Sequence, residues 1–344
     1  MKFGPVPLEE AEGKILGHNI AGHDGKRALR KGKPLTAEQV ALLRELGYTA
    51  VYVAELEPDD VDENTAAHRI AQAVVGQNLR LSGPATGRVN FMTTALGVLR
   101  VRVEALHRLN ATPDIALSTL PTNTAVAKGK MAATVKLIPY AVPEHSVAAV
   151  EAIAAEAGPI IHLDALRPCR TAVILSGTPS AQTRICHSFE PPLRARLEAL
   201  GTTIETIDFI PLEDDRGERA LAERLRQKVA DGAELIILAG ETAIMDRQDI
   251  APRAVERAGG EVACFGAPVD PGNLLMLAYL DGVSVLGAPG CVRSPKTNII
   301  DKVLPRLLAG DRLAQADIVS LGHGGLMEDV PERPFPRSRL ETGD

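Results

Sequence analysis

Aromatic residues are scarce in this chain of 344 residues: they make up 3%, and tryptophan is absent. Its cores must therefore consist of Ala, Val, Ile and Leu, a composition that suits buried parallel strands and the helices that cover them. The cysteines are Cys169, Cys186, Cys264 and Cys291, which lie far apart and form no C-x-x-C pair. This spacing argues against a zinc site or a disulfide framework. We predict no metal site and expect a reducing cytosol.

Long apolar runs and charge blocks are also absent. No run approaches the roughly 18 residues of a membrane span, and the opening MKFGPVPLEEAEG lacks the basic and apolar segments of a secretory signal. The net charge is -6, with basic residues interspersed among acidic ones. We therefore expect a soluble cytoplasmic protein without a nucleic-acid or membrane partner. An anionic ligand would have to be bound by local groups.

The common nucleotide and hydrolase signatures are missing too. The chain contains no G-x-x-x-x-G-K-[ST], G-x-G-x-x-G or G-x-S-x-G sequence. P-loop enzymes, standard dinucleotide-binding domains and α/β-hydrolases are thus not indicated.

The hydrophobic pattern divides the chain into two domains and a tail. Residues 1–167 mix amphipathic helices, expected at 35–47, 60–77 and 145–158, with strand-like segments at 49–56, 98–110 and 129–142. This pattern predicts an α+β domain. Residues 168–330 instead alternate strands with helices, and residues 331–344 form a C-terminal tail.

The second domain has the regularity of an α/β fold. Strands are expected at 170–177, 203–212, 234–240, 262–269 and 283–289, with helices at 189–201, 217–232 and 251–260. Such alternation predicts βαβ units and a doubly wound parallel sheet. Ligands of these sheets bind at the carboxyl ends of the strands.

The first two candidate loops follow two of these strands. In the first, Gly177 permits close backbone approach, and Ser176 and Thr178 offer hydroxyl donors; an ordinary strand-to-helix connection is the alternative. The second loop supplies turn residues and carboxylates, namely Gly240, Glu241, Thr242, Asp246 and Asp249. Asp249 stands before Pro252 and could equally be a helix N-cap.

The third candidate element joins two turn-rich segments. The first segment contains Pro271, Gly272 and Asn273, and the second contains Gly290, Arg293, Ser294 and Lys296. A guanidinium can bind phosphate through two hydrogen bonds, and an ammonium adds a point charge. The alternative is a solvated basic loop. Cys291 lies in this loop without a neighbouring His or Cys, which favours a packed residue over a nucleophile.

The loops resemble a known family when they are taken in order. ILSGTPS, ICHSF, PLEDDRGE, AGETAIMDRQD, DPGNL and GAPGCVRSP resemble, over residues 170–310, the molybdopterin-binding domain of molybdenum-cofactor biosynthesis proteins. The similarity is greatest to the molybdopterin molybdenumtransferase branch, whose N-terminal region residues 29–53 also resemble. The chain departs from the family where Thr178 and Pro179 replace the acidic pair of the first loop and where His187 and Phe189 replace the Asp and Asn of I-x-D-x-N. Asn273 likewise replaces the lysine of P-G-K-P.

The resemblance implies a protein that binds molybdopterin or the molybdenum cofactor and serves cofactor biosynthesis, delivery or sensing. Gly177 and Gly240 would allow close approach, and Thr242 and Ser294 would donate hydrogen bonds. Asp249 would accept from the pterin amino groups, while Arg293 and Lys296 would neutralise phosphate. The missing carboxylates and lysine favour binding over catalysis.

Two alternatives stay open. One is a Mg²⁺-dependent molybdenumtransferase or nucleotidyltransferase, in which Asp246, Asp249 and either Asp214 or Asp215 hold the metal. The other is a non-catalytic interaction module for a molybdenum-cofactor enzyme. Because the resembling family commonly self-associates, a homo-oligomer is expected.

Overall fold

The structure is a computed structural model that describes residues 1–212, 215–241 and 244–327. The chain forms two compact units, Met1–Asp164 and Ala165–Asp344. The predicted tail, 331–344, lies outside the described residues. In the part that is described, no helix has the length and apolar character needed to cross a membrane.

The N-terminal unit begins with a small sheet in the order β1 (Lys2–Pro7), β5 (Ala50–Glu55), β2 (Ile15–Leu16). A hairpin of β3 (Ile20–Ala21) and β4 (Arg27–Leu29) follows β2. Helix α1 (Ala37–Glu45) starts at a capping box, because Thr36 and Gln39 bond each other's backbone N–H. Its apolar face buries Leu43 against this sheet. The helix expected at 35–47 is therefore confirmed.

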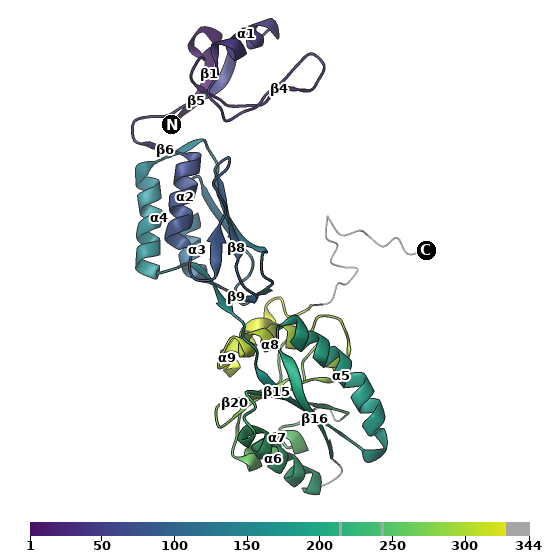
Figure 1. The fold of residues 1–344 in the computed structure, drawn as a ribbon. Coiled ribbons are helices and arrows are strands. Elements are labelled where there is room, and N and C mark those ends of the chain that lie inside the picture. Colours follow the sequence, from purple (N-terminus) through teal and green to yellow (C-terminus); the bar gives the residue numbers. More distant parts are fainter. Residues whose placement is uncertain (213–214, 242–243, 328–344) are drawn as a thin grey trace. The chain divides into compact units, whose positions relative to one another are not determined.

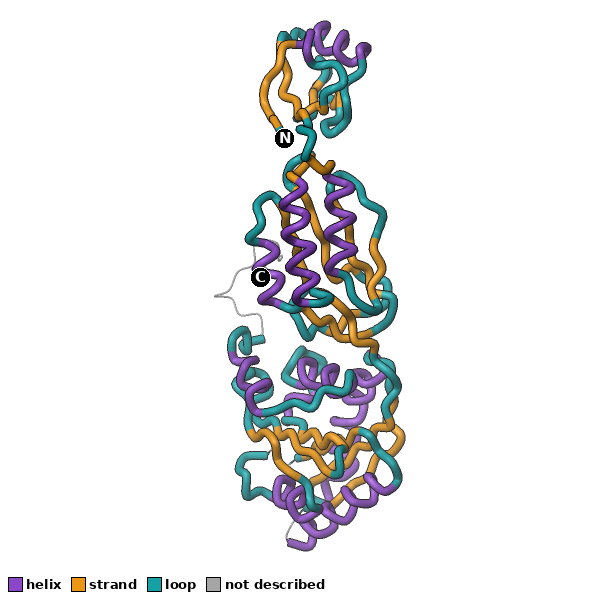
Figure 2. The backbone as a smooth tube through the Cα atoms, turned by 90° about the vertical axis from the view of Figure 1, so that its left-hand side faces the viewer, coloured by secondary structure: helices purple, strands orange, loops and turns teal. Residues whose placement is uncertain are grey.

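The rest of this unit is a helical layer on one face of an antiparallel sheet (Figures 1 and 2). The sheet has the order β10 (Ile115–Thr119), β12 (Met131–Leu137), β8 (Arg88–Thr93), β7 (Leu79–Leu81). Helices α2 (Glu63–Val74), α3 (Val103–Asn110) and α4 (Glu144–Ala157) cover it. Smaller sheets pair β6 (Asp60–Asp62) with β13 (Ala141–Pro143), and β9 (Gly97–Val101) with β11 (Ala125–Val126) and β14 (Ile161–Ala165).

One expectation in this unit is wrong. Residues 98–110 are not a single strand, because β9 ends at Val101 and α3 begins at Val103. Ala105 and Leu109 are buried four residues apart, the spacing of a helical face. The stretch therefore consists of the end of a strand followed directly by a helix.

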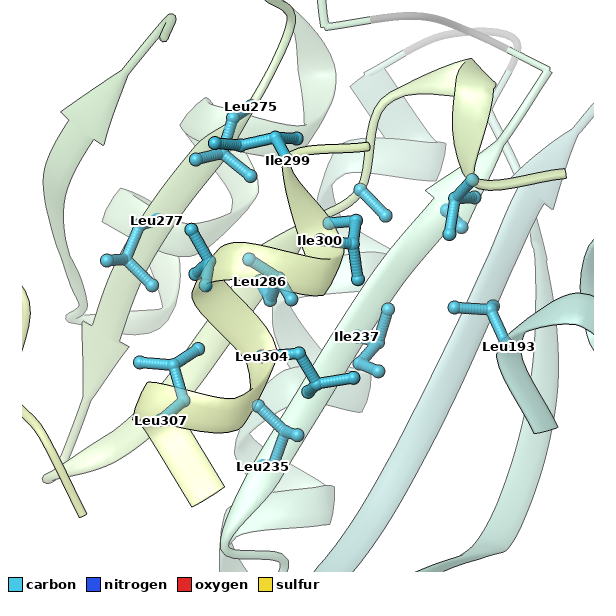
Figure 3. Packing of buried hydrophobic residues seen from close by; sticks show 14 of the residues in the cluster. Leu193, Leu235, Ile237, Leu275, Leu277, Leu286, Ile299, Ile300, Leu304 and Leu307 are labelled. Atoms are coloured by element: carbon cyan, nitrogen blue, oxygen red, sulfur yellow. The ribbon is translucent and has the colours of Figure 1, made fainter. Parts of the chain in front are cut away.

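The C-terminal unit is a six-stranded sheet between two helical layers (Figure 1). Its order is β16 (Thr203–Pro211), β15 (Arg170–Gly177), β17 (Leu235–Gly240), β20 (Val283–Gly287), β19 (Met276–Leu280), β18 (Glu261–Phe265). Helices α5 (Gln182–Ala199) and α8 (Ile300–Leu308) cover one face, and α6 (Asp215–Ala230) and α7 (Ile250–Ala258) the other. Figure 3 shows Leu193 of α5 and Leu304 of α8 packed around Ile237 and Leu286. The short helix α9 (Gln315–Val319) follows α8.

The sheet corrects the prediction of a wholly parallel, doubly wound arrangement. Strands β16, β15, β17 and β20 are parallel, but β19 is antiparallel to both β20 and β18. Asp281 and Gly282 join β19 to β20 with positive φ angles of 48° and 82°. Such an Asp-Gly pair forms the tight turn of a hairpin. The α/β class holds for this unit, whereas its sheet is mixed.

Helix α5 is longer than its sequence suggested. It begins at Gln182 rather than at residue 189, so that most of the expected first loop is helical. Pro191 and Pro192 lie inside the helix. The buried residues Ile185 and Phe189 continue the apolar stripe upstream, and their burial extends the helix past its two prolines.

Candidate functional site

The carboxyl ends of β15 and β17 bring the first two predicted loops together. Ser176 pairs with Gly240 across the sheet, and the Glu241 N–H donates to the Ser176 carbonyl at 3.0 Å. A Cβ atom on Gly240 would overlap that carbonyl, and one on Gly177 would overlap the side chain of Ile185. Both glycines therefore permit close packing of the protein with itself, which is a structural need separate from any ligand.

Glu241 and Thr178 have different surroundings at this edge. The Glu241 carboxylate forms an ion pair with Arg184 of α5. Thr178 is exposed, and its carbonyl accepts the Ala181 N–H at 3.0 Å as the chain enters the helical segment. Thr242, the predicted donor of this region, lies outside the described residues. The edge thus presents the Arg184–Glu241 pair beside the exposed Thr178.

The two acidic residues of the second loop fold the loop itself. Asp249 Oδ2 accepts the N–H groups of Met245 at 2.8 Å and Asp246 at 3.0 Å. Asp246 Oδ1 accepts the Gln248 N–H at 2.7 Å. Asp249 occupies the N-cap position of α7, but its carboxylate does not bond the helix. These hydrogen bonds give both carboxylates a local structural role.

The predicted Mg²⁺ ligands are not gathered in the structure as far as it is described. Among residues 1–212, 215–241 and 244–327, no group of three or more His, Cys, Asp or Glu side chains could hold a metal ion. Asp214 and the side chain of Asp215 lie outside the described residues. The described geometry therefore gives no support to a magnesium centre.

The two segments of the third element are in direct contact. Gly272 has φ 134°, and a Cβ atom there would overlap the Ile299 side chain. The Ile299 N–H donates to the Pro271 carbonyl at 3.1 Å. Asn273 is exposed and exchanges backbone and side-chain bonds with Ala267. The turn at 271–273 therefore supports the segment that follows β20.

The second and third loops also meet. A Cβ atom on Gly287, the last residue of β20, would lie 2.6 Å from the Ile244 Cδ1 atom. Since Ile244 belongs to the second loop, the packing of Ile244 on β20 brings that loop beside the start of the third.

Arg196 of α5 holds the 290–296 segment and was missed by sequence reasoning. Its side chain is 10% exposed. The guanidinium donates to three carbonyls of the segment, those of Val292 at 3.0 Å, Ser294 at 2.7 Å and Lys296 at 3.1 Å, and to Asp301 Oδ1 at 3.0 Å. A signal exists in the sequence, because an arginine stands between Leu193 and Leu197 on the buried helix stripe.

Asn298 completes this support. It is 1% exposed; its Oδ1 accepts the Ile300 N–H at 3.0 Å, and its Nδ2 donates to the Cys291 and Lys296 carbonyls at 3.4 and 3.3 Å. Burial raises the pKa of the Cys291 thiol, which fits a packed residue better than a nucleophile. The interior side of the segment is therefore occupied by structural contacts.

The exterior side of the same segment carries the groups that could bind a ligand. A Cβ atom on Gly290 would meet only Arg293 Nη2, at 3.9 Å, so the space beside it is open. The Arg293 guanidinium lies 5.4 Å from the centroid of the Phe189 ring, and its Nε donates to the Gly290 carbonyl at 3.1 Å. Ser294 Oγ accepts the Lys296 N–H at 3.1 Å and keeps its own hydrogen for donation. Arg293, Ser294 and open backbone thus lie within five residues.

Comparisons with known proteins give few constraints. The family model described as "Domain of unknown function (DUF8806)" matches residues 5–55. No curated protein matches the chain. Several solved structures do, at low identity.

Three of the matching structures illustrate the level of similarity. A molybdenum cofactor biosynthesis protein from Pyrococcus furiosus is 12% identical, with 93% of this chain and 65% of that chain covered and a TM-score of 0.24. A molybdopterin biosynthesis MoeA protein from Pyrococcus horikoshii is 14% identical, with 90% of this chain and 75% of that chain covered and a TM-score of 0.30. The molybdopterin biosynthesis enzyme MoaB from Thermus thermophilus is 15% identical, with 41% of this chain and 98% of that chain covered and a TM-score of 0.30. The chain spans 65% of the length of the P. furiosus protein, and likeness at these scores carries no inference about function.

Proposed function

We propose that the carboxyl edge of the C-terminal sheet binds molybdopterin or the molybdenum cofactor, and that the protein serves the biosynthesis, delivery or sensing of that cofactor. The proposal is supported by the order of the loops, which resembles that of the molybdopterin-binding domain family, and by the contacts among those loops. The observation that carries it is the Gly290–Ser294 segment. This segment is fixed on its inner side by Arg196 and has open backbone, a guanidinium and a hydroxyl on its outer side.

The chemistry of the segment suits the phosphate of molybdopterin. Arg293 can donate two parallel hydrogen bonds to a phosphate, and Ser294 can donate a third. The contact of the Arg293 guanidinium with the Phe189 ring limits the motion of this group before a ligand binds. Arg184 adds a second cation at the same edge, although Glu241 neutralises it. The predicted acceptor role of Asp249 is weakened, because one of its oxygens already accepts two backbone hydrogen bonds.

Binding by calorimetry tests the proposal. Titration of the full chain with molybdopterin should give saturable binding, and Arg293→Ala should weaken it. Loss of hydrogen bonds from a charged donor to phosphate corresponds to about tenfold or more in Kd.

A matched control exists at the opposite end of the sheet. Arg312 also stacks on an aromatic ring, with its guanidinium 4.0 Å from the Tyr279 centroid, and like Arg293 it is exposed. Arg312→Ala should leave the affinity unchanged. Absence of saturable binding, or equal losses in the two variants, would contradict the proposal.

A further inference from the structure

The N-terminal unit contains a pocket that the proposed site does not use. Its volume is about 750 Å³, within the range of small-molecule sites. Strand β1, the β3–β4 hairpin and the chain around Lys136–Tyr140 contribute its walls. The pocket is therefore large enough for a ligand the size of a nucleotide.

One wall of this pocket is basic. Arg27, Arg30 and Lys31 line it and are exposed. Within the described ranges, no carboxylate lies in ion-pair contact with any of these three side chains. Lys136 adds a fourth cation, held by Glu63 at 3.4 Å. Glu63 and Asp114 are the lining carboxylates, so the pocket has a positive excess in a chain whose net charge is -6. Such a local excess selects an anion.

Another part of the wall is apolar and aromatic. Phe3 is 48% exposed and Ile138 is 66% exposed, although both are large hydrophobic residues. The Phe3 ring meets the His18 ring edge to face, with centroids 5.7 Å apart. An exposed apolar surface inside a pocket indicates a binding surface, and a planar heterocycle can stack on such a ring.

The backbone around the cations is fixed by contacts within the unit. The Tyr140 hydroxyl donates to the Gly17 carbonyl at 2.8 Å. A Cβ atom on Gly32 would lie 3.2 Å from the Tyr140 ring, so the tyrosine packs against the chain next to Lys31. The Lys31 N–H donates to Asn19 Oδ1 at 3.0 Å. The backbone next to Lys31 is therefore fixed beside the aromatic wall before a ligand binds, which lowers the entropy lost on binding.

We infer that this pocket binds a planar heterocycle carrying one or more phosphates, with Arg27, Arg30 and Lys31 on the phosphates and Phe3 against the ring. A nucleotide and a phosphorylated pterin share this chemistry. The site is separate from the sheet edge that carries the proposed function, and it stands whether or not that edge binds molybdopterin.

The test is equilibrium binding to the full chain of CTP, GTP, a monophosphorylated pterin and inorganic pyrophosphate. We expect saturable binding of at least one heterocyclic phosphate, weakened by about tenfold or more in R27A/R30A. The matched control is R80A/R88A, which removes two exposed arginines of the same unit outside the pocket. Phe3→Leu should weaken the heterocyclic ligand and leave pyrophosphate unaffected. The member of the panel that binds most tightly shows whether the phosphate belongs to a nucleotide or to a pterin.

Several results would overturn the inference. They are binding of no member of the panel, equal losses in the two double variants, or pyrophosphate binding as tight as that of every heterocycle. Tighter binding of a single-stranded oligonucleotide than of any mononucleotide would replace it with a nucleic-acid site. Arg293→Ala separates the two sites, because it should change only binding at the sheet edge. If R27A/R30A weakens the binding of a phosphopterin and Arg293→Ala does not, that phosphopterin binds in this pocket.

Discussion

Replacement of Arg196 by methionine should release the 290–296 segment. The substitution keeps helix propensity and apolar volume but removes the hydrogen bonds to Val292, Ser294 and Lys296, together with the ion pair to Asp301. Loss of one partner of a buried pair costs about 3–5 kcal/mol. Because Asp301 is 31% exposed and can be hydrated, we expect the lower end, about 3 kcal/mol.

Hydrogen exchange followed by mass spectrometry is the suitable assay, because it reports on residues 290–301 separately from the N-terminal unit. A loss of about 3 kcal/mol corresponds to roughly a hundredfold faster exchange if the segment opens locally. Urea denaturation of the whole chain should show a lower midpoint for the C-terminal unit. Affinity for molybdopterin should fall in parallel, although Arg196 faces away from the proposed ligand.

The neighbouring Arg194 provides the control. It lies on the same helix, is 39% exposed and pairs with Glu190 at 2.7 Å. A surface pair of this spacing contributes about 0.3–0.5 kcal/mol, so Arg194→Met should increase exchange by about twofold at most. If Arg196→Met and Arg194→Met have the same effect, the structural role assigned to Arg196 is wrong.

Three further predictions concern single positions. Gly240→Ala should destabilise the protein by about 1–3 kcal/mol, because a Cβ atom would overlap the Ser176 carbonyl. Gly290→Ala, at a position with open space beside it, should change the unfolding free energy by less than about 0.5 kcal/mol. The midpoints of urea denaturation measure both effects. A backbone N–H and Arg306 lower the pKa of Asp317, so its stabilising effect is complete above the unfolded pKa of about 4 and is lost as the pH falls through the lower folded value. The Tm difference between wild type and Asp317→Asn should therefore be larger at pH 6 than at the acid end of this range, and a constant difference would refute the linkage. Because burial raises the pKa of Cys291, iodoacetamide at pH 8 should label it more slowly in the native than in the denatured chain, as peptide mass spectrometry would show.

The sequence predicted the parallel core well and its antiparallel edge poorly. The runs at 170–177 and 235–240 are apolar enough to be recognised as buried strands, and both are present. Strand β19 was missed because MLAYL lacks the alternation of a half-buried strand. Its turn, Asp281–Gly282, carried a hairpin signal that the expectation of βαβ units obscured.

The candidate site shows a different limit. Glycine and proline locate loops from local conformation alone, but the role of a glycine depends on what lies beside it. Gly240 accommodates Ser176, whereas Gly290 faces open space. The bonds of Arg196 to Val292 and Asp301 join residues that are 96 and 105 positions apart. Contacts of such range follow from tertiary packing, so no local pattern could assign them.

The reversed direction of β19 determines which loops can share a ligand. Met276, at the start of β19, pairs with Gly287, at the end of β20. The turn at 271–273 precedes its strand, yet it emerges at the same edge as loops that follow theirs. Had β19 run parallel, five residues at about 3.3 Å each would have placed that turn roughly 17 Å away, at the opposite edge. Because β19 is antiparallel, the loop before it lies at the edge where the other loops come after their strands. Changes in the length of the loop before β19 would alter this edge without disturbing the parallel strands.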